Sequence, residues 1–267
     1  MQTNLRSSWK RLETLLATAF AVVALVGGAS IRPALAGETL IIQGSTTFNR
    51  VFLELQQPAI ESATGHALTV IPNRTRPGII AVMEGRAHLA MVAAPLETEI
   101  QALRKALPGL AFDQLQAHPI LTTRVAITVH PSNPVRHTSL ALIKDVLRGR
   151  ITNWRALGGP DRPIRVVLVG GGGGVMTTVE SAILGGAQIE LPNIMFIRTA
   201  TQVVQVVEQE PAAMGFAQLA IVKQRGAPEL VTDNKIEQVL SFVTFGPPGE
   251  AAKLVIDAAR KIAENQM

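Results

Sequence analysis

The sequence contains no cysteine and no tyrosine, and aromatic residues make up only 4% of its 267 positions. The lack of cysteine excludes disulfides and every metal site that needs thiolate ligands. Charged residues are also sparse, at 17%, whereas hydrophobic residues reach 47%. This balance is typical of an ordered globular chain that is held together by its core, and the length suits one large domain or two lobes.

The first 36 residues differ in character from the rest. Arg6, Lys10 and Arg11 precede a short apolar run over residues 15–28, and small residues stand at Ala34 and Ala36. This three-part pattern predicts a secretory signal peptide, residues 1–36, that is cleaved after Ala36. The alternative is an N-terminal membrane anchor, for which the run is short because a span needs about 20 residues. We therefore expect export to the periplasm.

The basic excess of the chain lies mostly in this leader. The net charge is +5, but residues 1–36 hold four basic residues and one acidic residue, which leaves 21 basic and 19 acidic residues. The remainder carries +2 and has no Lys/Arg run with interleaved aromatic residues. We therefore expect no nucleic acid partner.

Strand-like and helix-like segments alternate after residue 37. Apolar runs predict strands over residues 40–42, 67–72, 88–95, 120–131, 164–169, 212–217 and 239–245. Amphipathic spacing predicts helices over residues 46–63, 79–84, 97–107, 139–147, 175–184, 201–208 and 247–265. This order indicates an α/β fold in which mostly parallel strands lie under covering helices.

A run of five glycines, Gly170 to Gly174, joins a predicted strand to a predicted helix. Such a run could be a phosphate cradle, a flexible linker or a binding loop without side chains. The dinucleotide fingerprint Gly-x-Gly-x-x-Gly fails, because its last position holds Val175, Met176 or Thr177. A P-loop fails too, because Val175 and Met176 stand where Lys and Ser or Thr are required. Both nucleotide interpretations are excluded.

The segment Gly44-Ser45-Thr46-Thr47 has the same arrangement of strand, small-residue turn and helix start. A helix N-terminus offers unbonded N–H groups and a partial positive charge, which favour an anion. Both segments, the second running from Gly170 to Thr178, are therefore candidate anion sites. Each is also ordinary architecture, in which Ser45 would serve only as a helix cap.

The groups that catalysis needs are missing or scattered. The sequence has no Gly-x-Ser-x-Gly elbow and no cysteine nucleophile. Its five histidines lack the spacing of metal ligands, and the pairs Glu97/Glu99 and Glu208/Glu210 lie on predicted helix faces, where charges are usually solvated. We therefore expect no enzyme, no catalytic residue, no metal and no cofactor.

Four segments, in order, resemble the phosphate-binding proteins of ABC transporters. IQGSTTFNRVFLEL, from residue 42, resembles the family's opening Gly-Ser-Thr loop, and EGRAHLAMVAAPLETEI, from residue 84, resembles its next block. AITVHPSNPVRHTSLALIKDVLRGRITNWRALGGPDRPIRVV, from residue 126, is the most specific match, since it is similar to the family's strand, Asn-Pro turn, helix and Gly-Lys-Ile-Thr-x-Trp block. AAMGFAQLAIV, from residue 212, resembles the later Gly-Ile-Gly-Tyr segment.

The resemblance implies a type II periplasmic binding fold, in which two α/β lobes, each a mostly parallel sheet flanked by helices, enclose a ligand cleft. Lobe 1 would comprise residues 37–122 plus 231–267, and lobe 2 residues 123–230. It also implies a solute-binding protein, expected as a monomer, that closes around a small anionic ligand and delivers it to an inner-membrane ABC permease.

The ligand site departs from the family's pattern at the glycine run. The family's Arg-x-Ser-Gly-Ser-Gly-Thr loop would place Arg at Val169, Ser at Gly171 and Gly173, and Thr at Val175. The family's aspartate after the third strand falls near Ala93 or Ala94. A guanidinium and several hydroxyls are thus missing, although backbone N–H groups could still form an anion nest.

The facing loop offers two arginines, Arg74 and Arg76, that could replace the missing charge or could be solvated loop charges. We therefore expect phosphate or a larger, organic anion as the ligand. The alternative is a degenerate site in a sensor or an envelope interaction protein on the same scaffold. The candidate ligand-binding residues are Gly44, Ser45, Thr46, Thr47, Arg74, Arg76, Gly171, Gly172, Gly173, Gly174 and Thr177.

Overall fold

The computed structural model describes residues 37–170 and 174–265. The predicted signal peptide lies outside these residues, as do Gly171, Gly172 and Gly173 of the glycine run. Within the described residues, no helix combines the length and the apolar character that crossing a membrane requires.

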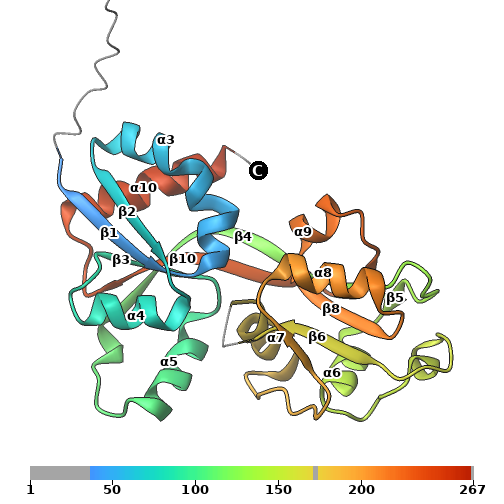
Figure 1. Cartoon of the computed structure of the whole chain (residues 1–267). Coiled ribbons are helices and arrows are strands. Elements are labelled where there is room, and N and C mark those ends of the chain that lie inside the picture. Colours follow the sequence, from blue (N-terminus) through green and yellow to red (C-terminus); the bar gives the residue numbers. More distant parts are fainter. Residues whose placement is uncertain (1–36, 171–173, 266–267) are drawn as a thin grey trace, which may run out of the picture. The chain divides into compact units, whose positions relative to one another are not determined.

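The first half of the chain forms three parallel strands with helices on both faces (Figure 1). Strand β1 (Thr39–Gly44) lies between β2 (Ala67–Pro72) and β3 (Leu89–Val92). The first helical stretch has three parts: α2 (Thr46–Phe48), a π-helical turn η2 (Asn49–Leu53) and α3 (Glu54–Thr64). Two helices, α4 (Thr75–Met83) and α5 (Leu96–Ala106), and the 3₁₀ turn η3 (Phe112–Gln114) complete this part.

Two long antiparallel strands, β4 (Leu115–Val129) and β10 (Ile236–Phe245), run from one half of the molecule to the other (Figure 1). Strand β10 pairs with β3, and the C-terminal end of β4 pairs with β8 (Ala213–Gln218). The sheet is therefore continuous through both halves, in the order β2-β1-β3-β10-β4-β8-β6-β7.

The second half continues this sheet and adds a small edge. Parallel strands β6 (Arg165–Val169) and β7 (Met195–Ile197) follow β8, while β5 (His137–Thr138) pairs with β9 (Glu229–Thr232) beside β4. The helical elements of this half are α6 (Leu140–Leu147), the 3₁₀ turn η4 (Trp154–Leu157), α7 (Gly174–Leu184), α8 (Ala200–Gln209) and α9 (Leu219–Gln224).

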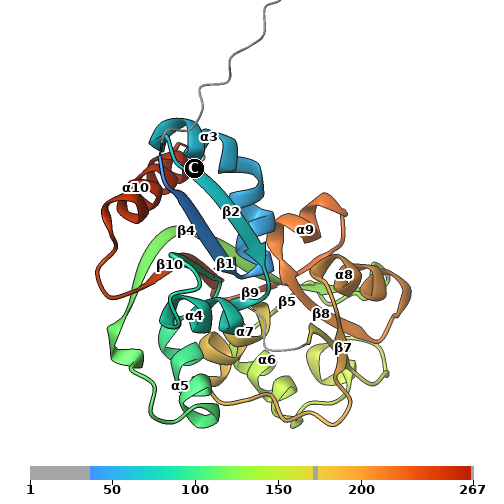
Figure 2. The same ribbon diagram turned by 60° about the vertical axis from the view of Figure 1, so that its left-hand side comes forward.

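The last helix, α10 (Glu250–Glu264), returns to the first half and lies beside α3 (Figure 2). Alternate residues of β1 explain why helices cover both faces, since successive side chains of a strand point to opposite sides. Leu40 and Ile42 pack into the cluster under α3 and α10, whereas Ile41 packs with α4 and α5.

Buried side chains form two pairs of clusters. One pair draws on residues 40–121 and 240–263, and the other on residues 125–236. We call the parts built around these pairs lobe 1 and lobe 2. Phe48 and Phe242 pack in lobe 1 with ring centroids 4.8 Å apart, and Trp154 is fully buried in lobe 2. Its indole N–H donates to the carbonyl of Ala212 at 3.0 Å, so the only polar atom of this ring is satisfied.

The α/β architecture predicted from the alternation of segments is confirmed, with differences at element ends. Helix α4 begins at Thr75 rather than at residue 79, and β3 ends at Val92 rather than at residue 95. The short strands β5, β7 and β9 were not predicted, because each has at most four residues. The lobe boundaries at residues 122/123 and 230/231 remain a prediction.

Candidate functional site

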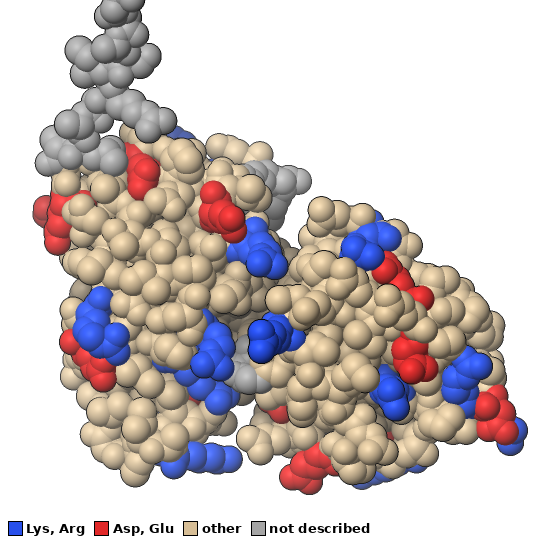
Figure 3. Space-filling model, viewed as in Figure 1, with Lys and Arg blue, Asp and Glu red and all other residues tan. Residues whose placement is uncertain are grey.

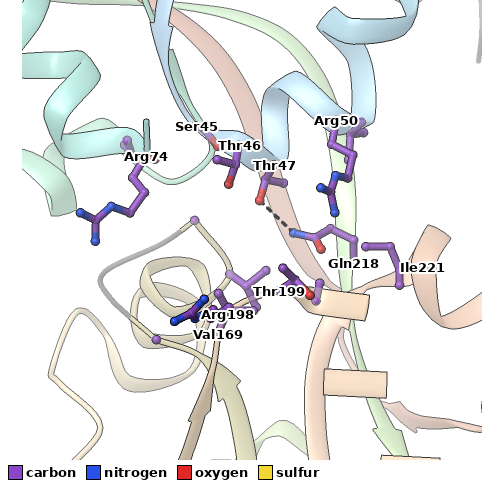
Figure 4. Close-up of a pocket in the computed structure, with 16 residues that line it drawn as sticks. Ser45, Thr46, Thr47, Arg50, Arg74, Val169, Arg198, Thr199, Gln218 and Ile221 are labelled. Carbon is purple, nitrogen blue, oxygen red and sulfur yellow. Dashed lines mark hydrogen bonds between the residues drawn. The ribbon is translucent and has the colours of Figure 1, made fainter. Parts of the chain in front are cut away.

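A pocket of about 220 Å³ lies between the two lobes (Figure 4). Lobe 1 contributes the end of β1 with the start of the helix after it, and also the turn that leads into α4. Lobe 2 contributes the ends of β6, β7 and β8 with the helices that follow them. Ligands of open α/β sheets bind in this position, outside the carboxyl ends of the strands.

Four helix N-termini meet at the pocket wall. They belong to the stretch that starts at Thr46, to α4 at Thr75, to α7 at Gly174 and to α8 at Ala200. The first and last are capped by Ser45 and Thr199, whose hydroxyls accept from the backbone N–H groups of Phe48 and Gln202, both at 3.2 Å. The partial positive charges of these termini add up at one place and favour an anion there.

Three arginines, Arg50, Arg74 and Arg198, line the same pocket. Within the described part of the chain, none of them forms an ion pair or a side-chain hydrogen bond, and no lining residue is acidic. The space-filling view shows basic side chains on both sides of the hollow between the lobes (Figure 3). The pocket is therefore strongly cationic, and its guanidinium groups are available to a ligand.

Arg74 has a backbone conformation that side-chain-bearing residues rarely adopt. Its φ of 80° is the only positive value among the described non-glycine residues, and its ψ is 159°. The flanking contacts hold it there. Asn73 donates its backbone N–H to the carbonyl of Gly44 at 2.9 Å and its side-chain amide to Gln43 Oε1 at 2.8 Å. A strained residue in a pocket wall is a sign of function.

Glycine is required at two positions of the site because the backbones approach so closely. At Gly44, φ is 133° and a Cβ would lie 2.3 Å from the carbonyl oxygen of Met91. At Gly174, a Cβ would lie 2.4 Å from the carbonyl oxygen of Ala93. The last glycine of the run therefore brings α7 of lobe 2 against the end of β3 in lobe 1.

Hydrogen bonds cross from one lobe to the other beside these glycines. Gln218 Nε2 donates to Thr47 Oγ1 at 3.3 Å across the pocket (Figure 4). Deeper in the molecule, Gln238 Nε2 donates to the carbonyl of Ala93 at 2.9 Å and to Thr178 Oγ1 at 3.2 Å. Gln238 is fully buried, and its Oε1 has no partner among the described residues.

The structure brings five of the eleven predicted site residues to the pocket wall: Ser45, Thr46, Thr47, Arg74 and Gly174. Gly44 lies directly behind them. Thr177 is buried and its hydroxyl has no partner among the described residues, but it does not line the pocket. Gly171, Gly172 and Gly173 lie outside the described residues.

Arg76 lies elsewhere, although only Thr75 separates it from Arg74. Its Nε donates to Glu99 Oε2 at 2.8 Å, and Glu99 is fully buried rather than solvated as its helix position predicted. A guanidinium held by a buried carboxylate is neutralised, so Arg76 does not belong to the pocket wall. Two positions are about half a helical turn, so the two side chains leave the start of α4 on opposite sides.

Sequence reasoning missed Arg50, Arg198 and Gln218 as lining residues. Arg198 directly follows a short strand and precedes the helix cap Thr199, which is the arrangement already noted at Gly44. Arg50 belongs to the π-helical turn η2, shortly after the Ser45 cap, and its side chain lines the pocket. The position of Gln218, at the end of β8, depends on the fold.

One titratable group near the lobe contact has a perturbed pKa. Burial of Glu180 on α7 raises the pKa of its carboxyl, while the hydrogen bond that Glu180 Oε1 accepts from the backbone N–H of Ile189 at 3.1 Å lowers it. The charge of Arg76 lowers this pKa and that of Glu99 raises it, so the Arg76–Glu99 pair of lobe 1 acts on a carboxyl of lobe 2.

Two α/β lobes joined by crossing strands around a cationic pocket define the type II periplasmic binding fold. The chain belongs to the PBP superfamily, because residues 32–263 match the sequence model of the PBP superfamily domain. The resemblance to phosphate-binding proteins is thereby confirmed at the level of family and fold.

Individual relatives agree with this assignment. The chain is 24% identical over 181 residues to the phosphate-binding protein PstS of Bacillus subtilis (strain 168). The matched stretch is 68% of this chain but only 57% of that protein. A phosphate-bound structure of a putative phosphate ABC transporter substrate-binding protein from Clostridium perfringens is 24% identical, with a TM-score of 0.67 over 82% of this chain and 92% of that one. An ABC-type phosphate transport receptor from Vibrio cholerae is 18% identical, with a TM-score of 0.68 over 85% and 95%.

Proposed function

We propose that this protein is an extracytoplasmic solute-binding protein that captures a small anion in the pocket between its lobes and delivers it to an ABC permease of the inner membrane. The observation that carries the proposal is the charge of the pocket. Three arginines without ion pairs and four helix N-termini face it, and none of its described lining residues is acidic.

The fold supports a capture mechanism. The two strands β4 and β10 connect the lobes, and hinge bending at such crossings closes lobes around a ligand. The bond between Gln218 and Thr47 is a direct link across the pocket, so a ligand seated there would contact both lobes at once. Ligand binding would thus favour the closed form through contacts that the open form lacks.

The names of the relatives support transport of an anion in general, and phosphate is one candidate. The leader-like segment over residues 1–36 supports an exported protein. A sensor on the same scaffold is the second candidate, since the missing side chains of the glycine run favour a site that is different from a phosphate transporter's. Neither role requires a catalytic group, and we propose none.

A thermal stabilisation screen tests the proposal. The protein, purified after expression of the full chain, is heated with phosphate, sulfate, organic phosphates and carboxylates in an anion-free buffer. A ligand at 100 times its dissociation constant stabilises the fold by about 2.7 kcal/mol, which is a clear shift in melting temperature. If no anion shifts the melting temperature, the proposed function is wrong.

Substitutions locate the binding site. We expect Arg50→Ala, Arg74→Ala and Arg198→Ala each to weaken a bound anion by about tenfold, because each removes a charge-assisted hydrogen bond. Arg148→Ala is the matched control, since Arg148 is exposed at the end of α6 and lies outside the pocket. Equal losses in all four variants would mean that the anion binds through net charge and not in this pocket.

A further inference from the structure

The two walls of the pocket differ in chemistry. Lobe 1 presents Ser45, Thr46, Thr47, Arg50, Arg74 and Thr75, with Val51 as its one apolar side chain. Lobe 2 presents the side chains of Val169, Val175, Ala200 and Ile221 together with the backbone of Gly170 and Gly174. Its polar contributions are Arg198, Thr199 and Gln218. The pocket is therefore amphiphilic: its lobe 1 side is almost wholly polar, whereas its lobe 2 side combines apolar side chains with Arg198, Thr199 and Gln218.

The apolar wall is not explained by core packing alone. Val169 and Ile221 pack against the core cluster that includes Val203 and Val207, yet both stay only partly buried. Both side chains line the pocket, and Figure 4 shows Val169 across from Thr46 and Thr47 and Ile221 beside Gln218. Apolar surface left open in a binding pocket favours a ligand that covers it, because that removes it from water.

A bare oxyanion uses only half of this pocket. Its oxygens can accept from the hydroxyls, arginines and backbone N–H groups on the lobe 1 side. Oxygens that lie against the side chains of Val169 and Ile221 would lose water and gain no donor from those two side chains, which is unfavourable. A ligand with one anionic end and one hydrocarbon end satisfies both walls, and the pocket of about 220 Å³ has room for more than one water molecule.

The charge of the polar wall selects the anionic end. Arg50 and Arg74 on this wall, Arg198 on the facing wall and the lack of a carboxylate among the described lining residues favour a head group with a full double charge over a singly charged carboxylate. We infer that the preferred ligand is an organic phosphonate or phosphate monoester with a short apolar substituent. Its head group binds at Ser45–Thr47, Arg50 and Arg74, and its substituent lies on Val169 and Ile221. This inference rests on the proposed anion-binding function.

The test compares two ligands that share a PO3 group and differ in its fourth substituent, which is a hydroxyl in phosphate and a propyl chain in propylphosphonate. Inorganic phosphate and propylphosphonate are titrated by calorimetry into protein purified after expression of the full chain. Each buried methylene is worth about fourfold in affinity, so three carbons give roughly 50-fold if all are covered. We expect propylphosphonate to bind at least about tenfold more tightly than phosphate.

Variants of the apolar wall supply an independent readout. Val169→Thr combined with Ile221→Thr adds a hydroxyl at each position, so we expect propylphosphonate to lose most of its advantage over phosphate, whose own affinity should not fall because the hydroxyls can donate to its oxygens. Val231→Thr is the matched control, since Val231 is exposed on β9 and lies outside the pocket. If the double variant fails to fold, the inference is judged only by which of the two ligands binds more tightly to the unsubstituted protein.

The outcomes separate the inference from the proposed function. Phosphate binding as tightly as propylphosphonate, or more tightly, overturns the inference and leaves the anion-binding function intact. If neither ligand nor any other anion binds, the proposed function fails and the inference fails with it. An unchanged preference in a folded double variant overturns the assigned position of the substituent.

Discussion

Replacing Arg74 by glycine should stabilise the fold while it weakens anion binding. The residue has φ 80° and ψ 159°, a region that is essentially restricted to glycine. A side-chain-bearing residue held there costs about 1–3 kcal/mol, and glycine removes this cost. Glycine also makes the unfolded chain more flexible, which costs about 0.4–1 kcal/mol. We therefore expect Arg74→Gly to be about 1 kcal/mol more stable than Arg74→Ala, because both variants lose the guanidinium but only alanine keeps the strain.

Urea denaturation followed by fluorescence measures this difference, since Trp154 is fully buried and reports on unfolding of lobe 2. The matched control is Arg148, which is also exposed but has φ −94° and ψ 3°. There the order should reverse, with Arg148→Gly less stable than Arg148→Ala by about 0.5–1 kcal/mol. If Arg74→Gly is no more stable than Arg74→Ala, the strain argument is refuted.

Both Arg74 variants should weaken a bound anion equally, since they lack the same guanidinium. Such a result would mean that the native residue is retained at a cost in stability because its side chain serves the pocket. A smaller loss of affinity in one variant would instead show that the backbone conformation matters for binding.

Three further predictions concern residues around the pocket. Arg76→Met should lower the free energy of unfolding by about 2 kcal/mol, which is less than the loss expected for a fully buried ion pair because Arg76 is partly exposed. Anion affinity should not change. Urea denaturation measures the stability and calorimetry measures the affinity. Glu180→Gln should flatten the pH dependence of stability. The raised pKa of Glu180 means that the folded state binds the proton more readily, so the free energy of unfolding of the native protein falls as the pH rises from the ordinary glutamate pKa through the raised value. Gly44→Ala should cost at least about 2 kcal/mol in urea denaturation, since its Cβ would meet the carbonyl oxygen of Met91.

Each of these has a result that would contradict it. The double variant Arg76→Met with Glu99→Leu should recover stability relative to Arg76→Met alone, and a further loss would mean that the buried carboxylate does not need its partner. Identical pH profiles for Glu180→Gln and the native protein would remove Glu180 as the source of the slope. A Gly44→Ala variant as stable as the native protein would mean that the β1 turn can shift away from Met91.

Sequence patterns predicted much of the fold, because hydrophobic periodicity and helix capping are local properties that show clearly in long, regular segments. Leu40 and Ile42 mark β1 as a buried strand, and Ser45 marks the start of the following helix, where its hydroxyl accepts from the N–H of Phe48. The short strands were missed, because three-residue β7 has neither length nor alternation. Its pairing with β6 is set by tertiary contacts.

The candidate site was only partly predictable. The Ser45–Thr47 loop and Gly174 could be found from the order of strand, turn and helix. Arg74 and Arg76 could not be told apart, because sequence spacing does not reveal which side chain meets a buried partner. Arg198 and Gln218 come from elements more than a hundred residues after Ser45, and only the fold brings them to the same pocket.

By itself, the sequence determined the α/β class, the absence of thiol chemistry and the kinship with anion-binding proteins. These follow from composition, periodicity and motif order, which are local properties of the chain. The tertiary structure alone decided that Arg74 faces the pocket while Arg76 pairs with Glu99, and that Gly174 must be glycine because α7 approaches Ala93. The polar and apolar walls of the pocket likewise come from different lobes. The physical reason is that charge pairing and close approach depend on distances between segments far apart in the sequence, which no local pattern encodes.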